Sequence, residues 1–142
     1  MAQKKNESIS PGGNDSPSVR PSFMHVLEEV REQINWRLLF ARSETVRPLA
    51  EEVAKIITEV YLMTDDIRIQ IDGEWVDAGL VREIYRQLTG DHICRVLDNY
   101  RQARTVIRRP RQYLRTCLYN VVFEAALAEE NEANVELADD RI

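Results

Sequence analysis

One short segment of the chain alternates strictly between apolar and polar residues, unlike the sequence around it. It reads Ile67-Arg68-Ile69-Gln70-Ile71, and Asp72-Gly73 follows directly. Alternation places the isoleucines on one face of a β-strand, and Asp-Gly is a favoured tight turn between antiparallel strands. Trp75-Val76 then supplies a very short return strand. Because a two-stranded hairpin is marginal by itself, this one must lie against other elements of the fold.

The other apolar residues recur with helical spacing in separate stripes. Ser22 is a suitable N-cap for the first stripe. The phase of that stripe slips at Asn35-Trp36, which indicates a break or a second short helix. Pro48 is compatible with a helix that starts near Thr45, because the first turn needs no amide donor. Thr89-Gly90 is expected to end a later helix. The stripes span residues 23–34, 46–60, 80–88, 93–107 and 113–125.

These patterns predict a mostly α (α+β) fold: a compact domain of about five helices with one small β-hairpin. Residues 1–21 are rich in Ser, Pro, Gly and Asn, and they lack the apolar content needed to offset the entropy of ordering. We therefore predict a disordered linker over 1–21 and the helical domain over 22–130. Residues 131–142 carry no apolar stripe and are expected to form a frayed acidic tail.

Length and composition limit the classes of protein to which this chain can belong. The 142 residues have a net charge of −5 and include only two cysteines, too few for a disulfide framework or a zinc site. No apolar run approaches the ~20 residues of a transmembrane helix, and the first residues lack the apolar core of a signal peptide. These features favour a cytoplasmic protein without membrane contact.

Charge is distributed unevenly along the chain. The segment from Arg95 to Arg115 contains seven arginines and a single acid, Asp98. From Glu129 onward there are six acids against Arg141. The mean charge therefore conceals a basic region that is followed by an acidic one.

Catalytic chemistry is not expected from this sequence. His25 and His92 lack a Cys, Asp or Glu at the spacing of a metal site or a catalytic triad, so we predict no enzyme, no metal and no cofactor. His92 stands at a helix start, where a capping or surface role is favoured. Trp36 and Trp75 could stack on nucleic-acid bases, but core packing is the favoured interpretation.

The arginines are the candidate binding residues. They fall on a helix end, a short connection and a helix start, where side chains converge into a basic corner. Helical spacing places Arg104 within an apolar stripe, from which it either reaches solvent or lines a groove with Arg101 and Arg108. We expect Arg108→Glu with Arg111→Glu to leave the fold intact and to abolish the interaction. The candidate set is Arg101, Arg104, Arg108, Arg109, Arg111 and Arg115.

Several short motifs carry a resemblance to a known family. They include His92-Ile93 with Val96-Leu97, and Tyr113-Leu114 with Leu118-Tyr119-Asn120. From Val30 to Asn120 the chain resembles the C-terminal domain of plasmid replication initiator A proteins from Gram-positive bacteria, a domain of unknown function. More distantly, it resembles the DnaD-like domains of bacterial primosome proteins.

This resemblance implies a non-catalytic module in plasmid or mobile-element replication initiation. Its partner would be a host replication protein, such as primase or a helicase loader, and no small-molecule substrate is implied. The alternative is a non-specific single-stranded nucleic-acid binder that uses the same arginines. The family's winged-helix domain has no counterpart in this sequence, so origin-specific binding is not carried over.

Overall fold

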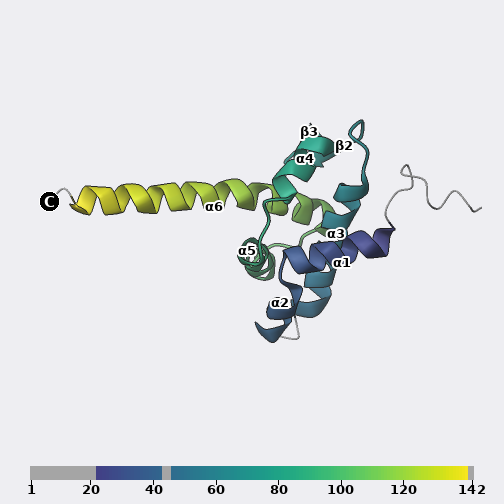
Figure 1. Cartoon of the computed structure of the whole chain (residues 1–142), viewed down its shortest axis with the longest axis horizontal. Coiled ribbons are helices and arrows are strands. Elements are labelled where there is room, and N and C mark those ends of the chain that lie inside the picture. The colour runs from purple at the N-terminus through teal and green to yellow at the C-terminus, as the bar shows by residue number, and fades with distance from the viewer. Residues whose placement is uncertain (1–21, 43–45, 141–142) are drawn as a thin grey trace, which may run out of the picture.

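The computed structural model describes residues 22–42 and 46–140, and the predicted linker over 1–21 lies outside them. The described residues form six helices and a single two-stranded antiparallel hairpin at the edge of the domain, so the predicted mostly α fold is confirmed (Figure 1). The elements are α1 (Phe23–Gln33), α2 (Trp36–Arg42), α3 (Arg47–Leu62), β2 (Arg68–Ile71), β3 (Glu74–Asp77), α4 (Ala78–Tyr85), α5 (Gly90–Arg101) and α6 (Pro110–Asp140).

The first two helices meet at a corner that the sequence predicts. Ser22 caps α1, because its Oγ accepts a hydrogen bond from the His25 backbone N–H at 3.1 Å. Asn35 then adopts a left-handed conformation with φ of 59°, which breaks the helix. A Cβ atom at Gly90 would lie 3.0 Å from the Ile34 carbonyl oxygen, so the start of α5 packs directly on this corner.

The hairpin has the register expected of a two-residue turn, with Arg68 opposite Asp77 and Ile71 opposite Glu74. Asp72 and Gly73 both have positive φ, at 54° and 84°, as a tight turn between twisted strands requires. Two hydrogen bonds attach it to the first turns of α6. The Asp72 N–H donates to Thr116 Oγ1 at 3.2 Å, and Gln112 Nε2 donates to Gln70 Oε1 at 2.7 Å.

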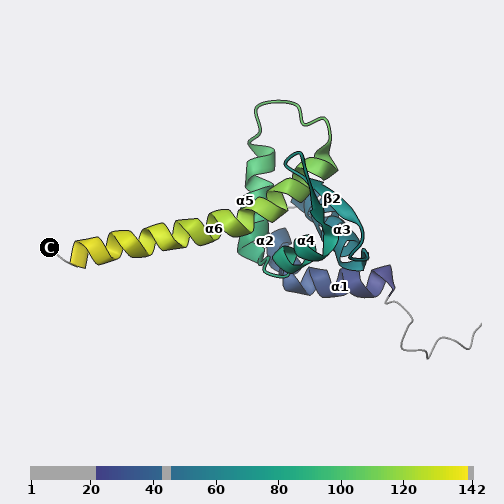
Figure 2. The ribbon, with the colours of Figure 1, turned by 90° about the horizontal axis from the view of Figure 1, so that it is seen from above.

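Helix α3 lies at the centre of the domain, in contact with α1, α2, α4, α5 and α6 (Figure 2). Its inward-facing residues Val53, Ile56, Ile57 and Val60 are fully buried. Burial of this kind supplies the main favourable contribution to folding. Leu118 of α6 is also fully buried, which confirms its predicted place in the core.

A partly buried polar network joins three helices. Gln33 Nε2 donates to the carbonyl oxygens of Tyr85 and Leu88 at 2.9 and 3.0 Å, and Tyr61 Oη donates to Gln33 Oε1 at 2.7 Å. Carbonyl groups at and beyond the end of a helix lack partners within it, so Gln33 supplies the donor that α4 needs. Tyr85 itself is fully buried and donates from its hydroxyl to the Arg115 carbonyl at 2.8 Å.

The junction of α4 and α5 differs from the prediction. Helix α4 ends at Tyr85, and Thr89 is the N-cap of α5 rather than the end of the preceding helix. The Thr89 N–H donates to His92 Nδ1 at 3.0 Å, and the Thr89 hydroxyl oxygen accepts from the His92 N–H. This reciprocal pair is a capping box. The capping role predicted for His92 is confirmed.

Helix α6 is longer than the sequence predicts. It remains helical through Asp140, where fraying after about residue 130 was expected. Its length has a local cause, since the segment 111–140 contains no Gly or Pro and is rich in Ala and Glu. Its second half leaves the domain, as Figures 1 and 2 show. Residues 126–140 are called the arm below. No helix in the described parts of the chain is long and apolar enough to cross a membrane.

Candidate functional site

The connection between α5 and α6, taken together with the last residue of α5, carries four of the six candidate arginines. It runs through residues 102–109 and rises as an open loop in Figure 2. We call residues 101–109 the basic loop. Its four arginines are exposed, and none forms an ion pair with any residue that the structure describes. They are Arg101, Arg104, Arg108 and Arg109.

Arg104 does not lie within an apolar stripe. Helix α5 ends at Arg101 with Gln102 as its C-cap, so the helical spacing used for the prediction stops before Arg104. The side chain is exposed in the loop instead. The predicted place of Arg104 in a helical stripe is therefore wrong, but its side chain does reach solvent, as the first of the two alternatives expected.

Arg111 and Arg115 belong to a different environment. The guanidinium of Arg111 pairs with Glu52 and, through Nη2, with Glu59 Oε2 at 2.6 Å. Arg115 Nη2 lies 3.6 Å from Glu59 Oε1. Partial burial, helped by the nearby charge of Arg115, lowers the pKa of Arg111. These two arginines attach α6 to α3, whereas the loop arginines point into solvent.

A shallow cavity of about 550 Å³ lies between the basic loop and the hairpin turn. Val106, Ile107 and Tyr113 give it apolar walls, while Arg108 and Arg109 stand on its rim. Val106 is 87% exposed, although it is a large aliphatic residue. The remaining lining residues are Asp72, Gly73, Thr105, Gln112, Thr116 and Cys117. Apolar walls beside unpaired cations form a surface that can bind a segment with both apolar and acidic groups.

Comparison with protein families identifies the family to which the chain belongs. A family of unknown function, DUF6017, matches residues 11–132. The chain belongs to the DUF6017 family. No curated protein matches the chain, and no solved structure matches it either. The DUF6017 match includes the basic loop, the cavity and both paired arginines, and it ends within the arm.

The two tryptophans of this DUF6017 chain differ in environment. Trp36 packs against the core and carries the Arg31 guanidinium 4.6 Å from its ring centroid, so its predicted packing role is confirmed. Trp75 is 64% exposed, and the prediction of core packing is wrong for it. It lies directly opposite Gln70, and opposed residues of antiparallel strands share a face. Gln70 bonds to Gln112 of the cavity wall, so Trp75 lies on the hairpin face that meets this region.

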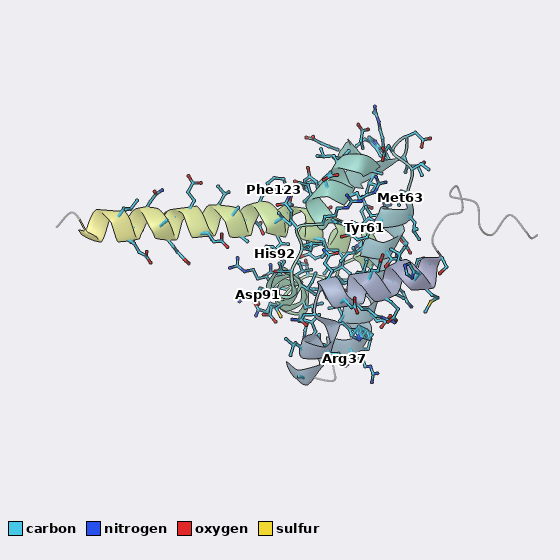
Figure 3. All side chains as sticks on the ribbon, in the orientation of Figure 1. Arg37, Tyr61, Met63, Asp91, His92 and Phe123 are labelled. Atoms are coloured by element: carbon cyan, nitrogen blue, oxygen red, sulfur yellow. The ribbon has the colours of Figure 1, made fainter. Side chains whose placement is uncertain are left out.

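The candidate metal ligands and the Cys117 thiol of the DUF6017 structure were compared with what metal binding and nucleophilic chemistry require. Within 22–42 and 46–140, no three His, Cys, Asp or Glu side chains come together in a group that could hold a metal ion. Cys117 lies half-buried on the cavity wall, and its burial raises the pKa of the thiol. A thiol of this kind stays protonated near neutral pH and is a poor nucleophile. Figure 3 shows His92 on α5 with its neighbour Asp91, at the capped helix start.

Proposed function

We propose that this domain is a non-catalytic interaction module that docks a host replication protein, a primase or a helicase loader, when a plasmid or mobile element initiates replication. The replication context rests on the resemblance to the C-terminal domain of plasmid initiators. One observation supports a docking role. Among the described residues, the basic loop carries four exposed arginines without ion pairs, and two of them, Arg108 and Arg109, line a cavity with apolar walls.

The chemistry of the surface suggests what it binds. A guanidinium presents several donors in a plane, which suits the paired oxygens of a carboxylate. Val106 and Ile107 add apolar area that a partner would remove from water. An acidic peptide segment with one apolar anchor residue satisfies both features. Such a segment on a replication protein is the partner we propose.

Single-stranded nucleic acid is the second candidate, and exposed Trp75 is the observation that favours it. Bases stack on exposed aromatic rings, while arginines bind the phosphates. Four phosphate contacts would lower the logarithm of the binding constant by about 3 for each tenfold rise in salt. Binding to a partly apolar protein surface falls less steeply with salt.

The test is a binding titration of the full chain against host primase, host helicase loader and a single-stranded oligonucleotide. Each is measured at about 50 mM and about 200 mM salt, because the salt slope separates phosphate binding from protein docking. Arg108→Glu with Arg109→Glu is expected to abolish binding. Arg37→Glu with Arg95→Glu is the matched control, since it makes the same charge change at exposed arginines outside the basic loop.

Circular dichroism of both variants comes first, to show that they fold. Docking predicts that one of the two proteins binds with a shallow salt slope. A steep slope with the oligonucleotide alone would transfer the function to nucleic acid. If the folded loop variant binds as the wild type does, the basic loop takes no part in the interaction.

A further inference from the structure

The cavity beside the basic loop favours a segment with a particular arrangement of charge. Val106 and Ile107 give it apolar walls, and Arg108 and Arg109 stand on the side of the loop. The basic loop contains four arginines and no acid. On the other side, the wall includes Asp72 of the hairpin turn. A fitting segment therefore has an apolar residue with acids on one side of it, so that the acids lie beside the loop and away from Asp72.

The arm at the far end of α6 has this composition. Residues 124–140 contain seven acids and no Lys, Arg or His. Val135 is 53% exposed there. Glu132 precedes Val135 by three residues and Glu136 by four, so the three residues lie on one face of the helix. That face presents one apolar side chain between two carboxylates.

A second apolar residue of the arm lies on a different face. Leu137 is 57% exposed, but Ala133 and Asn134, which share its face, carry no charge. Residues 129–138 are all exposed, so both faces are open to a partner. Charge therefore distinguishes the face of Val135 from that of Leu137 as a match for the basic loop.

The arm and the cavity of one chain cannot meet. Helix α6 has 31 residues without a break, which corresponds to about 45 Å at 1.5 Å per residue. The basic loop stands at the start of that length and the arm forms its other end, as Figure 2 shows. Only a second molecule can bring an arm to this cavity.

The first half of α6 limits how an incoming arm can lie. Arg111 and Arg115 are paired with acids of α3, while Gln112 and Thr116 bond to the hairpin. Within the described residues of this region, the arginines without ion pairs are those of the basic loop. An incoming helix therefore crosses the mouth of the cavity beside the loop, and does not run along α6.

We propose that the arm of one copy of this chain docks in the cavity beside the basic loop of a second copy. Val135 then packs against Val106 and Ile107, and the two acids on its face lie beside the loop arginines. Each chain has one arm and one cavity, at opposite ends of α6. The contact is therefore heterologous, and it continues head to tail from one copy to the next.

This inference rests on the proposed docking role of the cavity and adds a form of regulation to it. The arm has the chemistry expected of the partner segment, an acidic stretch with one apolar anchor. An arm in the cavity excludes the partner from it, so self-association and partner docking compete for one surface. Rising concentration of the chain favours the first of them.

The first test measures the mass of the full chain by sedimentation and light scattering, at about 50 mM and about 500 mM salt. At the lower salt, we expect the average mass to rise with concentration beyond that of two chains. The association should weaken at the higher salt, because the loop and the arm attract each other through exposed charges.

The second test identifies the face of the arm. Val135→Asn removes the apolar anchor without changing charge, and it should raise the dissociation constant of the contact at least ~10-fold. Leu137→Asn is the matched control, because it makes the same kind of change at an equally exposed residue on another face. It should change the constant by less than ~2-fold. Circular dichroism of both variants comes first, to show that they fold.

The third test separates the two halves of the contact. Arg108→Gln with Arg109→Gln impairs the cavity and leaves the arm intact, whereas Glu132→Gln with Glu136→Gln impairs the arm and leaves the cavity intact. Each variant alone should be monomeric. An equimolar mixture retains one intact arm and one intact cavity, so it should form a dimer with one chain of each kind and stop there.

Arg37→Gln with Arg95→Gln is the charge control, since both arginines are exposed outside the basic loop, and it should associate as the wild type does. Three results would overturn the proposal: a monomeric wild type at about 100 µM and low salt, equal effects of Val135→Asn and Leu137→Asn, and a mixture that stays monomeric. A wild-type mass that stops at two chains would exclude the head-to-tail contact. None of these measurements contains a replication protein, so failure of arm docking and failure of the proposed function are distinguished.

Discussion

Arg108 and Arg111 lie three positions apart in the same arginine-rich segment, yet among the described residues Arg111 has ion-pair partners and Arg108 has none. Glu52 and Glu59, which pair with Arg111, belong to α3 and lie more than fifty residues earlier in the chain. No local pattern reveals a contact between segments so distant. The ion pairs argue against the expectation that reversing Arg108 and Arg111 together leaves the fold unaffected.

The first prediction separates these two arginines by stability. Arg111→Glu places a third carboxylate beside Glu52 and Glu59, so it should lower the free energy of unfolding by about 1 kcal/mol or more. Arg108→Glu should change it by less than ~0.5 kcal/mol, because its side chain is exposed and unpaired among the described residues. Urea denaturation of both variants measures the difference. Equal losses would show that the ion pairs contribute nothing.

The second prediction concerns the buried phenol of Tyr85. Burial raises the pKa of Tyr85 above its ordinary value of about 10. The unfolded chain therefore ionises this group first as the pH rises. The stability that neutral Tyr85 contributes is fully present below pH ~10, and it is lost above that pH at about 1.4 kcal/mol per pH unit.

Comparison of the wild type with Tyr85→Phe isolates this effect. The variant loses the hydrogen bond to the Arg115 carbonyl, at a cost of about 1 kcal/mol at neutral pH. Between pH 9 and 11 its stability should fall less steeply than that of the wild type. Parallel curves from urea denaturation would mean that Tyr85 does not govern alkaline unfolding.

The third prediction tests the inward face of α6. Leu118 is fully buried, so Leu118→Ala should cost about 2–5 kcal/mol through lost burial and an unfilled cavity. Leu80 is 50% exposed, and Leu80→Ala is the control, with an expected change below ~0.5 kcal/mol. Thermal denaturation followed by circular dichroism distinguishes them. If Leu118→Ala left the stability unchanged, α6 would lie outside the core.

At the level of elements, the features that sequence predicts are those with local causes. The alternation of Ile67 to Ile71 with the following Asp-Gly turn predicts the hairpin, and the phase slip at Asn35 predicts the corner between α1 and α2. Both depend on residues within a few positions of each other. The bonds from Gln33 to the end of α4 depend on residues more than fifty positions away, and no sequence pattern indicates them.

The errors at element ends share another cause. Hydrophobic spacing indicates that a helix exists, but not where it stops. The pattern therefore continued α5 through Arg104, and it assigned Thr89 to the wrong helix. Trp75 shows a related limit, because a large aromatic residue on a hairpin is exposed or buried according to what packs over it. The candidate arginines were found from composition, while their division into paired and unpaired sets required the fold.

The fourth prediction belongs to the start of α5. Thr89→Ala removes the side-chain acceptor of the capping box and should cost about 1 kcal/mol. Thr105→Ala removes the same hydroxyl from an exposed loop position and should be nearly neutral. Thermal denaturation compares the two variants. A neutral Thr89→Ala would mean that the packing of Gly90 against the first corner positions α5 without its cap.

The molecule as a whole consists of a packed domain with a basic loop at one side and an acidic arm that extends from it (Figures 1 and 2). Arg111 and Arg115 connect the start of α6 to the central helix α3, while the hairpin turn bonds to Thr116. The first half of α6 is thus attached from two sides. The basic loop begins and ends on helices that pack against each other, so its arginines have a defined base.

Because α6 is half inside the domain and half outside it, a single helix should contain both slow and fast exchanging amides. The fifth prediction is that amide hydrogens at 114–125 exchange with deuterium only through global unfolding, since this half packs on the core. Those at 129–138 should exchange orders of magnitude faster in dilute solution, where local fraying suffices. Mass spectrometry of peptides along α6 would reveal the gradient.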